Sequence, residues 1–292
     1  MQEGEENLTQ IIKYVGYVCI IGRPNTGKST FLNTLLGEKV AITTNVPQTT
    51  RNKILGIYND EDSQIIFFDT PGIHKSENFF NQEINSQALS SLSEGDIILY
   101  FIDSTRDAGE EEKYIEEILK NLEKPIIKVY TKIDILTKKD IPQGENIVTI
   151  SSLKKLGFDE LLKKIKTYLP KGHPYYPEDY FTFQTMDFRI SEIIREKIFL
   201  HTKQELPHSI FVEIEEIEEQ ENLIRIISYI YTETESQKYI IIGKAGSLLS
   251  QIGKESRLDL ENIFGKKIFL SLRVKVSPKW RKNEIIAKKI LQ

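Results

Sequence analysis

The residues from Gly22 to Ser29 have the types and the spacing needed to hold a chain of phosphate groups. Gly22 and Gly27, followed directly by Lys28 and Ser29, match the pattern G-x-x-x-x-G-K-[ST]. The glycines let successive backbone N–H groups point at phosphate oxygens, Lys28 can reach the β- and γ-phosphates, and the Ser29 hydroxyl can bind Mg²⁺. We therefore predict a site for Mg²⁺ with a nucleoside triphosphate, bound by Gly22, Asn25, Thr26, Gly27, Lys28, Ser29 and Thr30.

The neighbouring segments support this interpretation. An apolar run, Tyr17–Ile21, precedes the loop and predicts a strand, and Thr30–Leu36 follows it and predicts a helix. A helix that begins here adds the positive end of its dipole to the phosphate site. An accidental glycine-rich turn would need neither neighbour, so we favour the nucleotide site.

A second motif, Asp69-Thr70-Pro71-Gly72, ends another predicted strand. Asp69 can hold a water of Mg²⁺, and the Gly72 N–H can meet the γ-phosphate. From the polar segment Pro47-Gln48-Thr49-Thr50-Arg51 we choose Thr50 to complete the Mg²⁺ ligands, beside Ser29 and Asp69. Loss of the γ-phosphate would release this segment and Gly72 together, which predicts a switch.

A third motif, Thr131-Lys132-Ile133-Asp134, predicts the choice of base. Asp134 can accept hydrogen bonds from the N1–H and the exocyclic amine of guanine, whereas adenine would present an acceptor to it. After the next predicted strand, Ser151 and Ser152 can offer backbone donors to the guanine oxygen. We therefore expect GTP and GDP as ligands, with Thr131, Lys132, Asp134, Ser151 and Ser152 around the base.

Short β-rich runs alternate with amphipathic segments through the first half of the chain. Apolar runs of this kind suit strands that are covered on both faces, so we expect an α/β fold in which helices wrap a mostly parallel sheet. Besides Tyr17–Ile21, the predicted strands are Ile65–Phe68, Ile97–Ile102, Ile126–Tyr130 and Ile147–Ile150, and the other predicted helices are Glu110–Asn121 and Phe158–Leu169.

A run of turn-forming residues, Lys171–Pro177, breaks this alternation. We therefore predict two domains, residues 1–172 and 173–292, of which the second is a smaller α+β domain. Its predicted elements are a helix Ser191–Leu206, strands Ser209–Ile217 and Leu223–Tyr231, a helical region Gly243–Phe264 and a strand Lys267–Val276.

The second domain contains Gly243-Lys244-Ala245-Gly246 after an apolar run, and its end is basic. A G-x-x-G loop can clamp the backbone of a single-stranded nucleic acid, although the pattern alone is weak. Trp280 lies in the basic cluster and could stack on a base; a packed Trp in a solvated terminal helix is the alternative. The predicted RNA-binding residues are Gly243, Lys244, Ala245, Gly246, Lys275, Lys279, Trp280, Arg281 and Lys282.

These motifs together resemble the Era family, bacterial GTPases of the translation-factor-related class with a carboxy-terminal type II KH domain. The resemblance is carried by Gly22–Ser29, by Gln48–Arg51, by Asp69–Gly72 and by the G-x-x-G segment with its order of elements. It implies a P-loop GTPase domain followed by a KH-type RNA-binding domain. It also implies binding to the 3′ region of small-subunit ribosomal RNA, a role in assembly of the small subunit, and peripheral membrane association.

The resemblance also bears on the catalytic residues. The expected set is Lys28, Thr50, Gly72 and Asn25. By resemblance Asn25 helps to hold K⁺ near the phosphates, although it could equally serve to turn the loop. The family usually has Asn in place of Thr131 and Ala in place of Ser152, and the shorter Thr131 predicts weaker guanine binding. Ile73 stands where many GTPases carry a water-orienting Gln, so slow intrinsic turnover is expected.

Composition excludes several other functions. A net charge of −4 argues against a protein that coats nucleic acid non-specifically, and one cysteine with four scattered histidines gives no zinc-ligand spacing. The polar, acidic start and the lack of a long apolar run predict a cytoplasmic protein, by resemblance peripheral on the inner face of the membrane, and we expect a monomer. Two alternatives remain: a nucleotide-dependent docking protein with negligible hydrolysis, and a kinase, which Asp134 disfavours.

Overall fold

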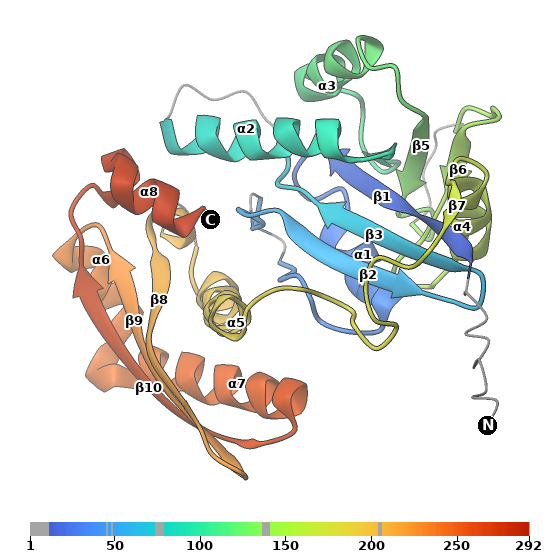
Figure 1. The fold of residues 1–292 in the computed structure, drawn as a ribbon. Coiled ribbons are helices and arrows are strands. Elements are labelled where there is room, and N and C mark those ends of the chain that lie inside the picture. Colours follow the sequence, from blue (N-terminus) through green and yellow to red (C-terminus); the bar gives the residue numbers. More distant parts are fainter. Residues whose placement is uncertain are drawn as a thin grey trace, which may run out of the picture.

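In the computed structural model, residues 12–44, 46–47, 49–73, 79–135, 141–203 and 206–291 are described. The chain forms two sheets, each with its own helices and its own apolar core (Figure 1). The expected order, a mostly parallel sheet wrapped by helices followed by a smaller α+β part, is therefore confirmed. Gln48 and His74 lie outside the described residues.

The first sheet has the strand order β2-β3-β1-β4-β5-β6, and β7 pairs with β1. All pairs from β3 to β6 are parallel, whereas β2 and β7 are antiparallel to their neighbours. Consecutive residues of β1 are fully buried, as expected of a strand covered on both faces. The strands are β1 (Lys13–Gly22), β2 (Ile54–Asn59), β3 (Ser63–Asp69), β4 (Ile97–Asp103), β5 (Ile126–Thr131), β6 (Ile147–Thr149) and β7 (Lys171–Gly172).

Four helices cover the two faces of this sheet. α1 and α4 pack on the face that carries Val18 and Ile20, and α2 and α3 pack on the face that carries Cys19 and Ile21. Cys19 is a small buried hydrophobe, as its apolar neighbours indicate. The helices are α1 (Lys28–Leu36), α2 (Phe79–Glu94), α3 (Glu110–Lys120) and α4 (Phe158–Lys166). This arrangement places the carboxyl ends of the parallel strands along one edge, where ligands bind in open α/β sheets.

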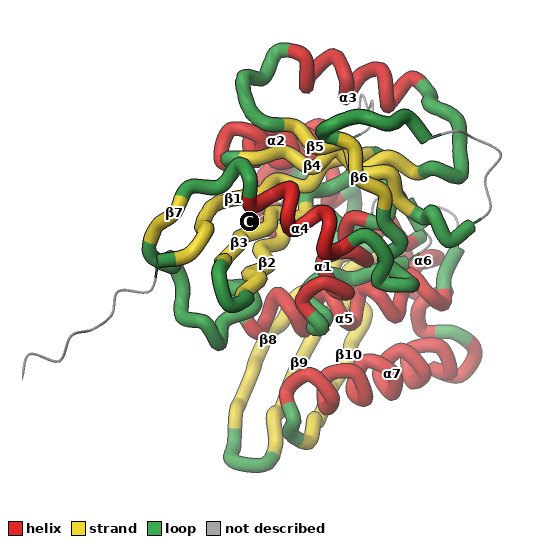
Figure 2. Tube along the Cα trace, turned by 90° about the vertical axis from the view of Figure 1, so that its right-hand side faces the viewer, coloured by secondary structure: helices red, strands yellow, loops and turns green. Residues whose placement is uncertain are grey.

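The second sheet has the order β10-β9-β8, with β9 and β10 parallel and β8 antiparallel to β9. α5 and α7 lie side by side on one face of it (Figure 2), where they bury an isoleucine-rich core. The elements are α5 (Met186–His201), β8 (Phe211–Glu219), β9 (Leu223–Thr232), α6 (Glu235–Ile242), α7 (Ser247–Phe264), β10 (Lys267–Val276) and α8 (Glu284–Ile290).

Some predicted boundaries are wrong. The first helix of the second part begins at Met186 instead of Ser191, because Thr185 caps its first turn, and it ends at His201. The apolar run before the G-x-x-G loop is the end of α6, whose first turn is held by a capping box of Thr234 and Gln237. The division at residues 172 and 173 stays a prediction. The segment after β7 lies along the first sheet, where Thr182 bridges Gly56 of β2.

Candidate functional site

The phosphate loop, residues 22–29, connects β1 to α1 as its pattern predicts. Gly27 has a φ of 91°, a left-handed conformation that favours glycine, and it caps the start of α1. The Lys28 side chain folds back over the loop and donates hydrogen bonds to the carbonyl oxygens of Gly22 (3.1 Å) and Arg23 (2.9 Å). Burial lowers the pKa of Lys28 to about 8. A phosphate chain would supply the negative charge that this buried ammonium lacks.

Gly72 lies against the phosphate loop. A Cβ atom on Gly72 would be 2.5 Å from the backbone nitrogen of Pro24, a distance that real side chains do not reach. The next residue, Ile73, donates its N–H to the carbonyl oxygen of Gly22 at 3.2 Å. The segment that follows β3 is therefore in direct contact with the phosphate loop.

Three oxygen-bearing side chains predicted to hold Mg²⁺ come together at the start of α1. The Ser29 hydroxyl donates to Asp69 Oδ2 at 2.5 Å and lies 3.0 Å from the Thr50 hydroxyl. Asp69 Oδ1 is buried without a hydrogen-bond partner among the described residues. Burial raises the pKa of Asp69 to about 6, against the opposing effects of Lys28 and Ser29. Hard oxygen ligands with one unpaired carboxylate oxygen fit Mg²⁺ well.

The covering loop, the described part of residues 42–51, closes a cavity of about 60 Å³ beside the phosphate loop. Within it the Thr49 hydroxyl is already bonded to Thr44 and to the carbonyl oxygen of Val46. The Thr50 hydroxyl faces Ser29 instead, which agrees with the choice of Thr50. The cavity is lined by Pro24, Asn25, Gly27, Lys28, Ser29, Thr30, Ile42, Thr43, Thr44, Thr49, Thr50 and Gly72.

The base loop, residues 131–134, follows β5 and meets the phosphate loop. The Thr131 hydroxyl is buried and donates to the carbonyl oxygen of Thr26 at 2.8 Å. The Asp134 side chain is exposed, so its carboxylate is accessible to a base. In the third loop the Ser151 N–H already donates to Leu156, at 3.1 Å, so Ser151 does not offer a free backbone donor as predicted. Ser152 is left as the candidate donor to the guanine oxygen.

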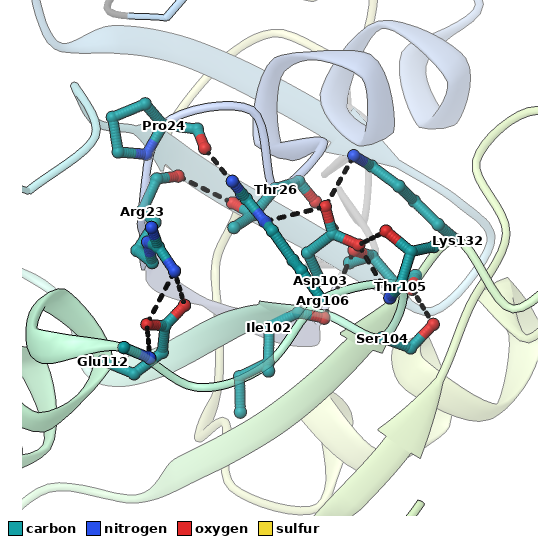
Figure 3. Close-up of polar contacts among 12 residues, drawn as sticks. Arg23, Pro24, Thr26, Ile102, Asp103, Ser104, Thr105, Arg106, Glu112 and Lys132 are labelled. Carbon is teal, nitrogen blue, oxygen red and sulfur yellow. Dashed lines mark hydrogen bonds and ion pairs between the residues drawn. The ribbon is translucent and has the colours of Figure 1, made fainter. Parts of the chain in front are cut away.

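Other residues join this site that the motifs do not include. Figure 3 shows Asp103 between Lys132 and Arg106, and Arg106 donates to the carbonyl oxygen of Pro24 at 2.8 Å. Arg23 makes ion pairs with Glu111 and Glu112 of α3. A signal for Asp103 exists in the sequence, because it ends β4 just as Asp69 ends β3.

The G-x-x-G loop lies between α6 and α7. Gly243 and Gly246 have left-handed φ values of 73° and 80°, as does Ala245 at 51°, and Lys244 is exposed. Beside the loop, α7 and β10 form a groove of about 610 Å³. The motifs do not include Lys254 and Arg257, although their spacing on one helix face is a readable signal. The groove is lined by Gly246, Leu249, Ser250, Gly253, Lys254, Arg257, Phe269, Leu270 and Leu272.

The basic carboxy-terminal residues do not line this groove. The Trp280 side chain is fully buried against Phe80 and Phe211, and its indole N–H donates to the carbonyl oxygen of Ser209 at 2.9 Å. The prediction that Trp280 stacks on a base is therefore wrong, because the aromatic face is used in packing. Lys275 lies over the Tyr229 ring and Arg281 pairs with Glu233, whereas Lys279 and Lys282 are exposed.

A larger cavity of about 740 Å³ lies between the two halves of the chain. Its lining includes Arg51, Arg195 and Phe211, but no residue of the phosphate loop or of the base loop. We do not assign it to the nucleotide, because the phosphate-binding groups lie elsewhere. Among the described helices, none combines the length and the apolar character needed to cross a membrane.

Comparison with known proteins finds a family match in each half of the chain. Residues 17–132 match the protein family described as 50S ribosome-binding GTPase, and residues 205–281 match the KH domain family. The chain is 43% identical over 287 residues to GTPase Era of Thermoanaerobacter sp. (strain X514), covering 94% of this chain and 95% of that protein. It is 44% identical over 290 residues to GTPase Era of Treponema denticola, covering 94% and 98%.

Two solved structures are similar over nearly the whole chain. One is Era in complex with MgGDPNP and nucleotides 1506–1542 of 16S ribosomal RNA, with a TM-score of 0.90 and 40% identity. The other is a single-residue variant of Aquifex aeolicus Era bound to GDP.AlF4-, with a TM-score of 0.88 and 40% identity. Each comparison covers 95% of this chain and 98% of the other.

Proposed function

The chain belongs to the GTPase Era family, and from this premise we propose that it binds Mg²⁺·GTP at the phosphate loop and the 3′ region of 16S ribosomal RNA at the groove between α7 and β10. As a member of this family it is an enzyme that hydrolyses GTP to GDP and phosphate. One observation carries the nucleotide site: Ser29, Thr50 and the unpaired Asp69 Oδ1 meet at the end of the phosphate loop.

The chain's own residues supply most of what hydrolysis requires. Lys28 exchanges its bonds to loop carbonyls for bonds to the β- and γ-phosphates. Gly72 offers its N–H to the γ-phosphate from a position against Pro24. Ser29, Thr50 and Asp69 would hold Mg²⁺ or its waters, and a bound ion would supply positive charge beside the phosphates. The Ile73 side chain has no polar group that could orient water, so intrinsic turnover is slow.

Guanine is selected by Asp134, whose exposed carboxylate accepts from N1–H and from the exocyclic amine. Thr131 and Lys132 place this loop beside the phosphate loop, and Ser152 donates its N–H to the guanine oxygen. Adenine places a ring nitrogen acceptor against Asp134, which leaves both groups unpaired. The chain therefore prefers GTP and GDP over ATP and ADP.

Asn25 supports a further proposal, that K⁺ binds beside the phosphates and assists hydrolysis. Asn25 lines the cavity with Lys28 and Gly72. Its φ of 63° also suits a residue that only turns the loop, since Asn tolerates this conformation. GTPase rates measured in K⁺ and in Na⁺ buffers of equal ionic strength separate the two roles. Equal rates would leave Asn25 as a turn residue.

The proposed RNA site rests on the G-x-x-G loop and its groove. Lys244 is exposed beside glycines whose backbone can approach a phosphodiester chain closely, and Lys254 and Arg257 add positive charge along α7. The RNA of the similar Era complex, nucleotides 1506–1542 of 16S ribosomal RNA, indicates the partner. Binding of this RNA connects the chain to the small ribosomal subunit and its assembly.

Two measurements test this function. Unlabelled GTP and ATP compete against labelled GTP, and we expect GTP to displace the label at far lower concentration than ATP; equal displacement contradicts the guanine site. Single-turnover hydrolysis of GTP is then measured with and without the 3′ RNA segment. Measurable hydrolysis supports the enzyme, whereas no turnover in either case favours a nucleotide-dependent docking protein.

The remaining proposals concern organisation and location. We propose that residues 1–172 form the GTPase domain and residues 173–292 the RNA-binding domain with its basic tail. A monomer in the cytoplasm, with peripheral contact to the inner face of the membrane, follows from the family resemblance. Sedimentation of the purified protein and cell fractionation test these two statements.

A further inference from the structure

Asp103 occupies the space between the base loop and the phosphate loop. It is the last residue of β4, and its side chain is only 3% exposed. The carboxylate atom Oδ2 lies 2.7 Å from the Lys132 Nζ and 3.1 Å from the Arg106 Nε. Arg106 in turn donates from its Nη2 to the carbonyl oxygen of Pro24 at 2.8 Å (Figure 3). One continuous set of contacts therefore runs from Lys132 to Pro24.

The two ends of this set of contacts lie in the base loop and in the phosphate loop. Lys132 has a φ of 62°, a left-handed conformation that costs free energy in a residue with a side chain. Pro24 is the residue that the backbone of Gly72 touches in the phosphate loop. The ion pairs through Asp103 thus connect the strained base loop to the part of the phosphate loop that meets the switch segment.

The need for this connection follows from Thr131. A threonine hydroxyl has one proton, and here Thr131 donates it to the carbonyl oxygen of Thr26. The asparagine that the family usually has at this position carries two N–H donors. It could therefore contact the phosphate loop and the base at once. In this chain the base receives no such donor from Thr131. Its binding therefore depends on the positions of Lys132 and Asp134 more than it would with asparagine at position 131.

We propose that Asp103 is a positioning residue for nucleotide binding, which holds the base loop against the phosphate loop through Lys132 and Arg106. This inference rests on the proposed nucleotide site. Burial opposes ionisation, but hydrogen bonds from Lys132 and Thr105 hold the pKa of Asp103 below its ordinary value, so that it is charged at neutral pH. The carboxylate is a positioning group because it acts on the ligand only through other residues.

A purely structural role is the alternative, since Asp103 Oδ1 also accepts from the N–H of Thr105 (2.9 Å) and from its hydroxyl (2.6 Å). The variant Asp103→Asn distinguishes the two roles. Its amide oxygen can keep the bonds from Thr105, whereas the neutral amide loses the ion pairs to Lys132 and Arg106. A structural role predicts an unchanged nucleotide affinity as long as the variant folds.

The experiment compares full-length wild type, Asp103→Asn, Thr131→Asn and the double variant. The Kd for GDP with Mg²⁺ and the KM and kcat for GTP are measured at low and high salt. For Asp103→Asn we expect Kd and KM to rise about fivefold to tenfold, with kcat unchanged. This rise should be smaller at high salt, because the ion pairs of Asp103 with Arg106 and Lys132 are partly exposed and salt screens them. Thr131→Asn should tighten binding and reduce the effect of Asp103→Asn in the double variant.

The results separate the two proposals. If wild type does not bind GDP, the proposed nucleotide site itself is wrong. If wild type binds and Asp103→Asn binds equally well, or loses kcat and melting temperature with KM unchanged, the positioning role is wrong. If Asp103→Asn does not fold, the variant Arg106→Met decides, because Arg106 is 36% exposed and its loss removes the contact to Pro24 and one of the ion pairs, whereas the pair of Asp103 with Lys132 remains. An unchanged KM in that variant overturns the inference.

Discussion

Arg51, at the end of the loop that covers the phosphate site, donates a 2.8 Å hydrogen bond to the carbonyl oxygen of Ile210 in the RNA-binding half of the chain. The same guanidinium also donates to the carbonyl oxygens of Pro207 (3.3 Å) and His208 (3.0 Å). In the opposite direction, Arg195 of α5 donates to the carbonyl oxygen of Thr49. The loop that carries the predicted Mg²⁺ ligand Thr50 is therefore hydrogen-bonded directly to α5 and to the segment before β8.

Arg51→Ala should weaken the dependence of RNA binding on the bound nucleotide. The substitution removes three hydrogen bonds from a charged donor that is 3% exposed, and bonds of this kind contribute about 1.5–3 kcal/mol each when they cannot be replaced. The ratio of RNA Kd values with GDP and with a GTP analogue should fall toward one. Lys113→Ala, at a surface ion pair on α3, is the control. A ratio equal to that of wild type would show that Arg51 does not couple RNA binding to the bound nucleotide.

Asp69→Asn should stabilise the nucleotide-free protein at neutral pH while it weakens Mg²⁺ binding. The folded pKa of Asp69, about 6, lies above the value of 3.8 for an unperturbed carboxyl. The folded state therefore binds the proton more tightly, and stability falls as pH rises between these values. A difference of about two units between the folded and unfolded pKa values lowers the free energy of unfolding by about 3 kcal/mol above pH 6.

The measurement is urea unfolding of wild type and Asp69→Asn at pH 5 and pH 7.5 without nucleotide. We expect the two proteins to differ less in free energy of unfolding at pH 5, where Asp69 in the folded wild type is largely protonated. At pH 7.5 this difference should be larger. A difference that does not change with pH would show that the buried charge is not responsible.

Lys244→Asp combined with Gly246→Asp should abolish RNA binding and leave GTP binding intact. Lys244 is exposed, Gly246 has a φ of 80°, and the added carboxylates would face the phosphodiester backbone. We expect a loss of RNA affinity of at least about 100-fold, measured by fluorescence anisotropy with the 3′ RNA segment. Lys238→Asp on the neighbouring helix is the control, because it makes a similar charge change outside the groove. Unchanged RNA affinity would exclude the clamp.

Trp280→Ala should destabilise the protein rather than affect RNA binding directly. The indole packs between Phe80 of α2 and Phe211 of β8, so truncation leaves a cavity that lowers the free energy of unfolding by about 3–5 kcal/mol. Trp280→Phe keeps part of the packing but loses the hydrogen bond to the carbonyl oxygen of Ser209, which contributes about 1 kcal/mol to the free energy of unfolding. Urea unfolding measures both. If RNA affinity of the folded variants drops with stability unchanged, the packing role is wrong.

Elements with a strong local pattern are predictable from sequence. The apolar runs at Ile65–Phe68 and Ile97–Ile102 are strands because such runs suit a sheet covered on both faces. The sequence does not reveal β2, since it is a short strand with Gly56 in its interior, and glycine weakens a strand pattern. It does not reveal α2 either, because this helix is rich in Ser, Asn and Gln, with a single apolar line at Phe80, Ile84, Ala88 and Leu92.

The sequence by itself determined the chemistry of the loops. A lysine beside glycines before a helix predicts a phosphate site, and carboxylates at the ends of parallel strands predict ligands for metal and base, because each motif is a short continuous segment. The family and its two activities follow from these short segments.

Only the tertiary structure decided which side chains are available. In the folded chain Trp280 is buried, and the N–H of Ser151 is bonded to Leu156. The Thr50 hydroxyl faces Ser29, and Asp103 lies between the base loop and the phosphate loop. The contacts of Trp280, Thr50 and Asp103 join residues far apart in the chain, and burial decides whether a polar or aromatic group meets solvent, ligand or protein. A local pattern can name such residues as candidates, but it does not contain their contacts.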